Sequence, residues 1–307
     1  MQISNYTNIN NSFEQKLVFH FGEKAGFYSE FNNMVLAIIY CLVNDIKFTI
    51  YSVDANFRTN KGWNDFFKPF CNESTNILNH FFNKRAHPRK IGRQKFYHQI
   101  NKLFFHNLLT TSDVWYEVRK LDSNLSDFDY ERYFPKAKDL QSVCNEVVDM
   151  IYYFNDETQY EVDKIKSLVQ FEGEYIGFHI RGGDKFLEHQ LIEVTDYIQK
   201  AEAISEIRQG YVFTDDYSLF ELMCKEFPSW TFQTLAPKED TGYFHKQFIK
   251  LPVEVRKSKT IQMFASIDIL SNAQHSFCTF SSNVGMFLGM KMGNRAHGVD
   301  FENWLIW

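Results

Sequence analysis

Apolar and polar residues alternate along the second half of the chain as a doubly wound α/β domain requires. Short apolar runs that predict buried strands are followed by amphipathic stretches long enough for helices. The predicted strands cover residues 175–180, 211–214, 230–234 and 276–280. The predicted helices cover residues 195–208, 217–226, 260–272 and 283–292. This order predicts a parallel sheet with helices on both faces.

The first half opens with a unit of the same kind. A strand is predicted at 17–21, a helix at 31–42 and a second strand at 47–53. A polar and aromatic connection follows, and from 77 to 160 the pattern is mainly helical. We therefore expect two domains: residues 1–165, an N-terminal α/β and helical domain, and residues 166–307, a C-terminal Rossmann-like domain.

The overall composition is that of a soluble globular protein. Of 307 residues, 44% are hydrophobic and 23% are charged, and the formal net charge is −5. A net negative charge argues against nucleic acid as the main partner. One basic stretch, from Lys84 to Lys95, runs against this average. It is either a solvated loop or an edge that meets an anionic acceptor or a membrane surface, a peripheral contact.

Neither a signal peptide nor a transmembrane segment is predicted. The N-terminus is polar, and the longest apolar run, 34–43, is about half as long as a membrane span. The five cysteines form no CxxC pair, and Cys41, Cys224 and Cys278 sit in apolar segments. Buried free thiols in a reducing compartment fit this pattern. The sequence therefore predicts a cytoplasmic protein.

The most informative segment is the end of the strand predicted at 175–180. The apolar run ends in His179 and Arg181, followed by two glycines, Asp184 and Lys185. Ligands of parallel α/β sheets bind at the carboxyl edge, where this segment would deliver its charges. Glycines let a backbone come close to a ligand, and the two cations suit phosphate. We predict a nucleotide diphosphate site, although an ion pair in a tight turn would use the same residues.

Two further strand ends place polar residues at the same edge of the predicted sheet. These residues are Asp215 and Asp216 after one strand and Ser281, Ser282 and Asn283 after the other. Hydroxyl groups and the free amides of a helix N-terminus suit a diphosphate. Both groups of residues would also serve as plain helix caps.

Asp268 interrupts an otherwise apolar pattern in the helix predicted at 260–272. A carboxylate on an apolar helix face needs a partner, and the N1–H and amino groups of guanine would supply a bidentate one. If the helix is turned differently, Asp268 faces solvent instead.

Together these segments resemble the three motifs of the alpha-1,6-fucosyltransferases, a family that includes the N-glycan core fucosyltransferases and the bacterial nodulation fucosyltransferases. The matching segments are His179-Ile-Arg-Gly-Gly-Asp-Lys185, Phe213-Thr-Asp-Asp216, and Asp268-Ile-Leu-Ser271 leading to Cys278-Thr-Phe-Ser-Ser-Asn283. In the first half, the segment that opens with Gly26 and Phe27 looks like the family's donor-side loop, and Gly62-Trp63 matches a Gly-Trp downstream of it. The resemblance implies the GT-B fold type, an α/β architecture of two Rossmann-like domains facing a cleft.

The resemblance also implies how a GDP-sugar is held. Arg181 would neutralise the β-phosphate of GDP, with Ser282 and Asn283 assisting. His179 and Asp268 would hold the guanine.

Further matched residues would act near the sugar. Lys185 and Asp184 would shape the site beneath it, and Asp215 and Asp216 would order the neighbouring loop. Tyr197 occupies the place of a family tyrosine near the donor.

The chain departs from the family pattern at two points. The catalytic base of the family is a glutamate four residues after the motif lysine, whereas Glu188 lies three residues after Lys185. Glu188 is the favoured base and Glu193 a reserve. Gly182 replaces the second arginine of the motif, so one phosphate contact is lost or supplied elsewhere.

The implied activity is an inverting, metal-independent transfer of fucose from GDP-fucose to a carbohydrate hydroxyl, which forms an α-fucoside. Fixed cations at the departing β-phosphate would stabilise the transition state, and a carboxylate would deprotonate the acceptor. No residue cluster has convincing metal-ligand spacing, so neither a metal nor a cofactor besides the donor substrate is expected. The alternatives are another GDP-sugar or linkage, or a catalytically weak homologue that binds a nucleotide sugar or glycan.

A long loop is predicted at 236–257. Loops of this length are usually functional or disordered. We expect this one to order as a lid when the GDP-sugar binds.

Overall fold

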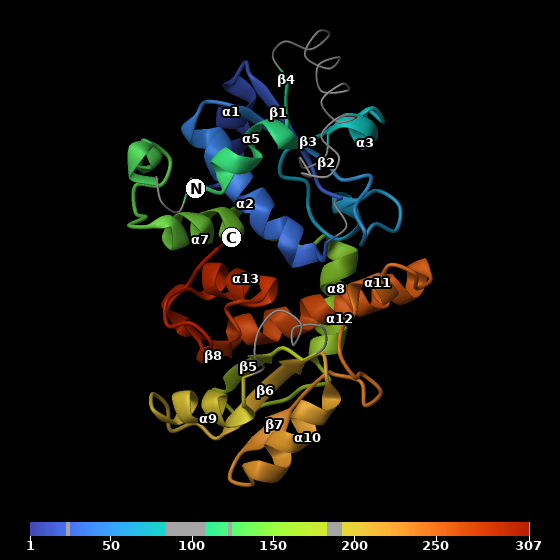
Figure 1. Ribbon diagram of the computed structural model, residues 1–307, viewed down its shortest axis with the longest axis vertical. Coiled ribbons are helices and arrows are strands. Elements are labelled where there is room, and N and C mark those ends of the chain that lie inside the picture. Colours follow the sequence, from blue (N-terminus) through green and yellow to red (C-terminus); the bar gives the residue numbers. More distant parts are fainter. Residues whose placement is uncertain (23–24, 84–107, 122–124, 183–191, 307) are drawn as a thin grey trace. The chain divides into compact units, whose positions relative to one another are not determined.

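The computed structural model describes residues 1–22, 25–83, 108–121, 125–182 and 192–306. They form two compact units, residues 1–155 (unit 1) and residues 156–306 (unit 2). Each unit contains one parallel β-sheet with helices packed against it (Figure 1). The predicted α/β class with two parallel sheets is therefore confirmed.

The sheet of unit 1 has the strand order β3-β2-β1-β4, and every neighbouring pair is parallel. The strands are β1 (Lys16–His20), β2 (Lys47–Tyr51), β3 (Asn72–Glu73) and β4 (Leu108–Thr110). The chain first builds β2 and β3 on one side of β1 and then returns to place β4 on the other side. The topological switch point of this sheet therefore lies between the carboxyl ends of β1 and β4.

Helix α2 (Phe27–Val43) is the central helix of unit 1. It packs on β1 and β2 and also against α5 (Thr111–Val118) and α7 (Leu140–Ile151). The predicted helix at 31–42 is confirmed but begins earlier, because Phe27 and Tyr28 are buried as well. The remaining helical elements of unit 1 are α3 (Asn79–Phe82), η1 (Trp63–Asp65), η3 (Leu125–Asp127) and η4 (Tyr130–Arg132).

The aromatic residues of unit 1 form much of its core. Trp63 stacks on Phe67 with ring centroids 4.3 Å apart, and Phe27 stacks on Phe67 at 5.5 Å. The turn before Trp63 is fixed by Asp65, whose carboxylate accepts hydrogen bonds from the four amides of residues 59–62. The Gly62-Trp63 pair is thus part of the packing of unit 1.

The polar N-terminus forms a helix that the sequence pattern did not predict, α1 (Ile3–Ser12). Its buried Asn10 accepts a hydrogen bond from the Phe48 amide (2.7 Å) and donates one to the Phe48 carbonyl (2.9 Å). Phe48 lies in β2 just before the pairing with β3 begins. The helix therefore satisfies backbone groups that a neighbouring strand would otherwise pair, a contact invisible to local periodicity.

The sheet of unit 2 has the strand order β7-β6-β5-β8-β9, again with every pair parallel. The strands are β5 (Ile176–Ile180), β6 (Gln209–Thr214), β7 (Thr231–Gln233), β8 (His275–Cys278) and β9 (Ala296–Gly298). The four predicted strands are confirmed. Strand β9 was missed because three residues with no apolar run give no signal before they pair with β8. The switch point lies between β5 and β8.

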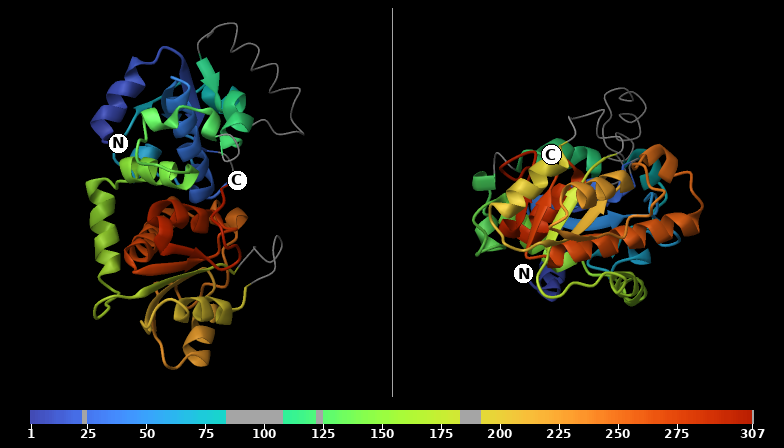
Figure 2. Two further views of the ribbon diagram at one scale, coloured as in Figure 1. Left: turned by 90° about the vertical axis from the view of Figure 1, so that its left-hand side faces the viewer. Right: turned by 90° about the horizontal axis from the view of Figure 1, so that it is seen from below.

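Helices cover both faces of this sheet (Figure 2). Helices α9 (Val194–Glu202) and α10 (Tyr217–Glu226) pack on one face, and α12 (Val253–Asn272) packs on the other together with α13 (Asn283–Met292). The other helical elements of unit 2 are α8 (Asp156–Lys166), α11 (His245–Phe248) and η6 (Gly293–Arg295).

Three predictions from the sequence need correction. The helix predicted at 195–208 ends at Glu202, and the loop predicted at 236–257 contains α11 and the start of α12. Strand β4 interrupts the stretch predicted to be mainly helical. The strand was missed because only its pairing with β1 makes it recognisable.

All five cysteines are free thiols, but they differ in burial. Cys41, Cys144 and Cys278 are buried, whereas Cys224 is exposed despite its apolar neighbours in sequence. Its place on the outer side of α10 explains the difference, because Met223 is the buried residue of that helix. Among the described residues, no helix combines the length and apolar composition needed to cross a bilayer.

Candidate functional site

The end of strand β5 brings a histidine and an arginine to the switch point of unit 2. Ile176, Phe178 and Ile180 point into the core beneath α9 and α10. Because side chains alternate along a strand, His179 lies on the opposite face of the sheet, the one covered by α12. Arg181 follows directly after the strand and is half-buried. The motif thus supplies one buried imidazole and one guanidinium.

His179 is a neutral, buried imidazole. Only 2% of the residue is exposed, and burial, followed by the charge of Arg181, lowers its pKa from 6.5 to about 3. The Thr279 amide and hydroxyl approach its carbonyl oxygen at 3.3 Å. Its Nδ1 atom has no hydrogen-bond partner among the described residues. An unpaired buried nitrogen beside the strand end is what a bound ligand would satisfy.

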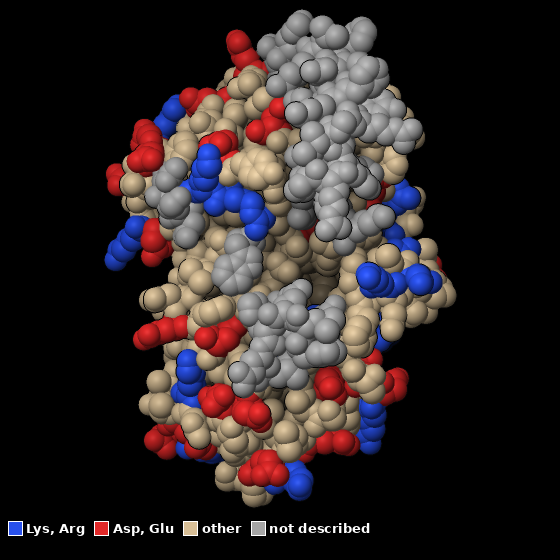
Figure 3. Space-filling view, in the orientation of Figure 1, with Lys and Arg blue, Asp and Glu red and all other residues tan. Residues whose placement is uncertain are grey.

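Arg181 is held by a carboxylate and an aromatic ring. It forms an ion pair with Asp215, which follows the neighbouring strand β6, and its guanidinium lies 5.5 Å from the ring centroid of Tyr243. Only 18% of the Arg181 side chain and 14% of the Asp215 side chain are exposed. On the face of unit 2 drawn in Figure 3, acidic and basic side chains are interspersed. Arg181 brings a local positive charge to this strand end.

Asp215 connects this arginine to a distant loop. Its carboxylate accepts hydrogen bonds from the amides of Gly182 (2.8 Å) and Tyr243 (3.0 Å), and its carbonyl accepts one from the Gly242 amide (2.7 Å). Asp216, the next residue, caps α10 by accepting a hydrogen bond from the Ser218 amide (3.0 Å). The expectation that both aspartates cap this helix is thus correct only for Asp216.

The third strand end forms the expected helix cap. The Ser282 hydroxyl accepts a hydrogen bond from the Gly285 amide (3.0 Å) at the start of α13. Ser281 and Ser282 are buried, while Asn283 is exposed as the first residue of the helix.

Asp300 is a residue of this region that sequence reasoning missed. Its carboxylate accepts hydrogen bonds from the amides of Phe280 (2.6 Å) and Ser281 (2.7 Å). It therefore fixes the loop between β8 and α13. Asp300 follows β9, and since β9 carries no sequence signal, nothing in the sequence indicated that this carboxylate reaches β8.

Tyr197 is buried beneath the site. Its hydroxyl lies 2.6 Å from the Thr279 hydroxyl, and burial raises its pKa well above the usual range. This neutral hydroxyl bond ties α9 to the residue that follows β8. In unit 2, Tyr197 therefore supports the strand end from below.

Asp268 is not brought to these residues. It lies near the end of α12, where it forms an ion pair with Lys166 of α8. Burial, followed by the charge of Asp268, raises the pKa of Tyr175 to about 12, and Tyr175 precedes β5. Asp268 is thus near the amino ends of the strands, whereas His179 and Arg181 are at the carboxyl ends. Helix α12 runs antiparallel to the strands and leads directly into β8, so its last turn lies at the amino edge of the sheet.

Gly26 and Phe27 belong to unit 1. Gly26 occupies the N-cap position of α2, and Phe27 is buried in the aromatic core described above. The phenyl ring is therefore committed to packing, and a ligand could use only the backbone of this turn.

Several predicted site residues lie outside the described part of the chain. They are Asp184, Lys185 and Glu188, and the basic stretch from Lys84 to Lys95 also lies there. The reserve base Glu193 is described: it is exposed and precedes α9 without capping it through its side chain.

Comparison with known proteins adds the fold family. No family model matches the sequence, and no curated protein matches it. Among solved structures, NodZ alpha-1,6-fucosyltransferase soaked with GDP-fucose is similar over 90% of this chain and 92% of its own, with 14% identity and a TM-score of 0.54. The fold is that of the fucosyltransferases.

Two further structures agree with this fold. Fucosyltransferase NodZ from Bradyrhizobium matches over 92% of both chains with 13% identity and a TM-score of 0.54. A mutant of FUT1 from Arabidopsis thaliana in complex with GDP matches 96% of this chain and 72% of its own, with 11% identity and a TM-score of 0.56. The similarity of fold thus extends over both units.

Proposed function

We propose that this protein is a glycosyltransferase that moves fucose from GDP-fucose to a carbohydrate hydroxyl. The observation that supports this most is that the neutral His179 and the ion-paired Arg181 both lie at the switch point of unit 2, in a fold shared with fucosyltransferases solved with GDP-fucose or GDP. In this proposal the chain has the GT-B type of fold. Unit 2 binds the donor and unit 1 serves the acceptor.

Donor binding uses the residues that meet at the switch point. Arg181 neutralises the β-phosphate, and the unpaired Nδ1 of His179 accepts a hydrogen bond from the guanine. Ser281, Ser282 and Asn283 present the start of α13, whose positive dipole end favours the diphosphate. Asp268 has no part in this arrangement, because it pairs with Lys166 at the other edge of the sheet.

The proposed reaction is an inverting displacement without a metal. Negative charge develops on the β-phosphate oxygen as GDP leaves, and Arg181 stabilises that charge more in the transition state than in the ground state. A carboxylate, Glu188 or else Glu193, removes the proton of the attacking hydroxyl. Lys185 and Asp184 shape the site beneath the sugar, and the attack from the opposite face gives an α-fucoside.

One observation favours a second candidate, a binder of nucleotide sugars or glycans with weak activity. A Cβ atom built on Gly182 would lie 3.0 Å from the Cβ of Asp216, closer than side chains normally approach. A side chain at this position, such as the second arginine of the family motif, would therefore require Asp216 to shift by a few tenths of an ångström. A lost charged phosphate contact would weaken donor binding by about 1.5–3 kcal/mol.

The first experiment tests Arg181. Calorimetric titration with GDP should show that Arg181→Ala weakens binding by about 1.5–3 kcal/mol, on the order of 10- to 150-fold, because the β-phosphate loses its charged partner. Arg208→Ala is the matched control, since Arg208 lies just before β6, at the amino edge of the same sheet, and packs over Trp230. Equal GDP affinity of the wild type and Arg181→Ala would contradict the proposed donor site.

A transfer assay separates the two candidate functions. With GDP-fucose and a panel of carbohydrate acceptors, an enzyme shows turnover that Arg181→Ala abolishes. GDP binding without transfer or donor hydrolysis would support the binder instead.

A further inference from the structure

The switch point of unit 1 carries a polar cluster that the donor site does not use. His20 is the last residue of β1, and Thr111 follows β4. The two are joined by a hydrogen bond from the His20 amide to the Thr111 hydroxyl (2.7 Å). In open parallel sheets, ligands bind at this point, where neighbouring connections leave in opposite directions.

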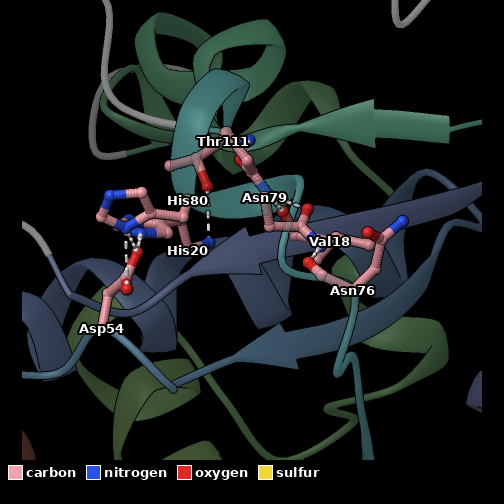
Figure 4. Close-up of polar contacts among 8 residues, drawn as sticks. Val18, His20, Asp54, Asn76, Asn79, His80 and Thr111 are labelled. Atoms are coloured by element: carbon pink, nitrogen blue, oxygen red, sulfur yellow. Dashed lines mark hydrogen bonds and ion pairs between the residues drawn. The ribbon is translucent and has the colours of Figure 1, made fainter.

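Asp54 joins two imidazoles in this cluster (Figure 4). Its carboxylate lies 2.8 Å from Nε2 of His20 and 2.9 Å from Nδ1 of His80. Partial burial works to raise the pKa of Asp54, but the hydrogen bonds and charges of the two histidines outweigh it and hold the pKa below its usual value. An ionised carboxylate only accepts hydrogen bonds, so both imidazoles donate to it.

This arrangement fixes which nitrogen of His80 a ligand can use. Because Nδ1 bonds to Asp54, only Nε2 is left for a ligand, and Nε2 accepts a hydrogen bond whenever the ring is unprotonated. Among the described residues, no hydrogen-bond partner lies at this Nε2. Exposure rises along the cluster, from 0% of the His20 side chain through 18% of Asp54 to 47% of His80. The open end of the cluster is therefore the Nε2 side of His80.

The short helix α3, which carries His80, is held to the sheet by asparagines. The side-chain amide of Asn83 donates a hydrogen bond to the backbone carbonyl of Val18 (2.6 Å). Its side-chain oxygen accepts one from the backbone amide of Thr111 (2.9 Å). Asn79 bonds to both Asn83 and the Asn76 carbonyl, as Figure 4 shows in part. A four-residue helix has little stability of its own, so these bonds are what place His80.

Gly22 allows Asp54 to reach the cluster. A Cβ atom at this position would come within 2.6 Å of the Cβ of Asp54. The close approach of the two segments therefore requires glycine. The cluster is built from four separate parts of the chain and is preorganised without a ligand.

We propose that His80, oriented by Asp54 and His20, binds a hydroxyl group of a neutral carbohydrate in unit 1. The acceptor nitrogen takes a hydrogen bond from an O–H group, while the adjacent carboxylate repels anions. Phe81 stands edge-on to His80 at 5.0 Å and is 56% exposed, which offers an apolar face for a sugar ring. The choice of a carbohydrate rests on the proposed transferase function. His80 binds the ligand, and Asp54 and His20 are positioning residues.

The site is tested by NMR on the full chain with isotope-labelled histidine. The probes are the methyl glycosides of glucose, galactose, mannose and N-acetylglucosamine, titrated up to their solubility. At least one glycoside should shift the His80 ring signals saturably and leave the signals of His275, in unit 2, unchanged. Asp54→Ala should weaken this binding on the order of tenfold, because the ring loses its fixed tautomer and orientation.

The exposed His80 also provides a variant that should fold normally. His80→Ala should abolish glycoside binding, measured by line broadening of the ligand signals, and keep the GDP affinity of the wild type. Binding that survives in His80→Ala, a His80 signal that responds to no glycoside, or one that responds to inorganic phosphate instead would overturn the proposal. If the wild type does not bind GDP, only the proposed donor site is contradicted. Failure of the donor site and failure of the His80 site are therefore distinguishable.

Discussion

At the scale of single residues, the candidate donor site depends on how one arginine is held. Arg181 is paired with Asp215 and packed against Tyr243, two residues from different segments. Asp215 also accepts hydrogen bonds from the backbone amides of Gly182 and Tyr243. One carboxylate therefore positions both the guanidinium of Arg181 and the loop beside it. Asp215 is therefore a positioning residue, and its removal should loosen the loop that contains Gly242 and Tyr243.

Substitution of Asp215 tests this role. Asp215→Ala should make residues 238–246 more sensitive to trypsin, with cleavage at Lys238 and Lys246 faster on the order of tenfold, because the loop loses hydrogen bonds and its arginine contact. Limited proteolysis followed by mass spectrometry measures the rates. In the wild type, saturating GDP should slow the same cleavages if this segment closes as a lid; unchanged rates would count against the lid.

The neighbouring aspartate supplies the control. Asp216→Ala removes only the N-cap of α10, which should cost about 1 kcal/mol of stability and leave the loop cleavage rates near those of the wild type. Equal loop sensitivity in both variants would mean that Asp215 has no special role.

At the scale of elements, short or polar segments depend on contacts made far away in the chain. Strand β9 and helix α1 have weak local signals, yet each makes specific hydrogen bonds to a segment far away in the chain. Asp300, after β9, binds two amides of the loop after β8, and Asn10 of α1 binds the backbone of β2. Such elements are held by specific hydrogen bonds more than by an apolar face.

Helix α1 gives a test of that view. Asn10→Ala should lower the free energy of unfolding by about 2 kcal/mol or more, because the N–H and C=O groups of Phe48 would be left buried without partners. Urea denaturation followed by circular dichroism measures the change. Asn8→Ala, at an exposed position of the same helix, should stay within about 0.5 kcal/mol of the wild type. A similar loss in both variants would point to helix propensity as the cause.

At the scale of the whole molecule, the two units share one plan. In each sheet the chain adds two strands on one side of the first strand and then crosses to the other side, with orders β3-β2-β1-β4 and β7-β6-β5-β8-β9. Each switch point holds a buried histidine at the end of the first strand, His20 in unit 1 and His179 in unit 2. The same topology thus creates two sites with different chemistry, one around a carboxylate and one around a guanidinium.

The buried histidine of unit 2 makes stability depend on pH. The unfolded chain protonates His179 below about pH 6.5, whereas the folded protein resists protonation until about pH 3. Between these values the unfolded state binds more protons, so stability falls as the pH is lowered, by up to about 1.4 kcal/mol per pH unit from this group. Above pH 6.5 the group contributes no slope.

The variant His179→Gln should remove this contribution. Its free energy of unfolding, measured by urea denaturation between pH 4 and pH 8, should change less steeply with pH than that of the wild type. Parallel curves would show that His179 is not kept neutral by the fold.

The sequence by itself determined the long regular elements and the residues at the end of β5, but not α1, β4 or β9. Buried parallel strands and amphipathic helices are set by local periodicity, so the alternation in unit 2 and the residues after β5 and β8 could be read directly. The caps made by Asp216 and Ser282 were also readable, because a cap depends on neighbours in sequence.

Only the tertiary structure decided which polar groups meet. It paired Arg181 with Asp215, brought Asp300 to the end of β8, placed Asp268 at the opposite edge of the sheet, and assembled His20, Asp54 and His80 in unit 1. Each of these outcomes depends on strand order and on the direction of a helix, which local periodicity does not encode. A side chain's residue type sets its chemistry, but its partner is set by where the fold brings distant segments together.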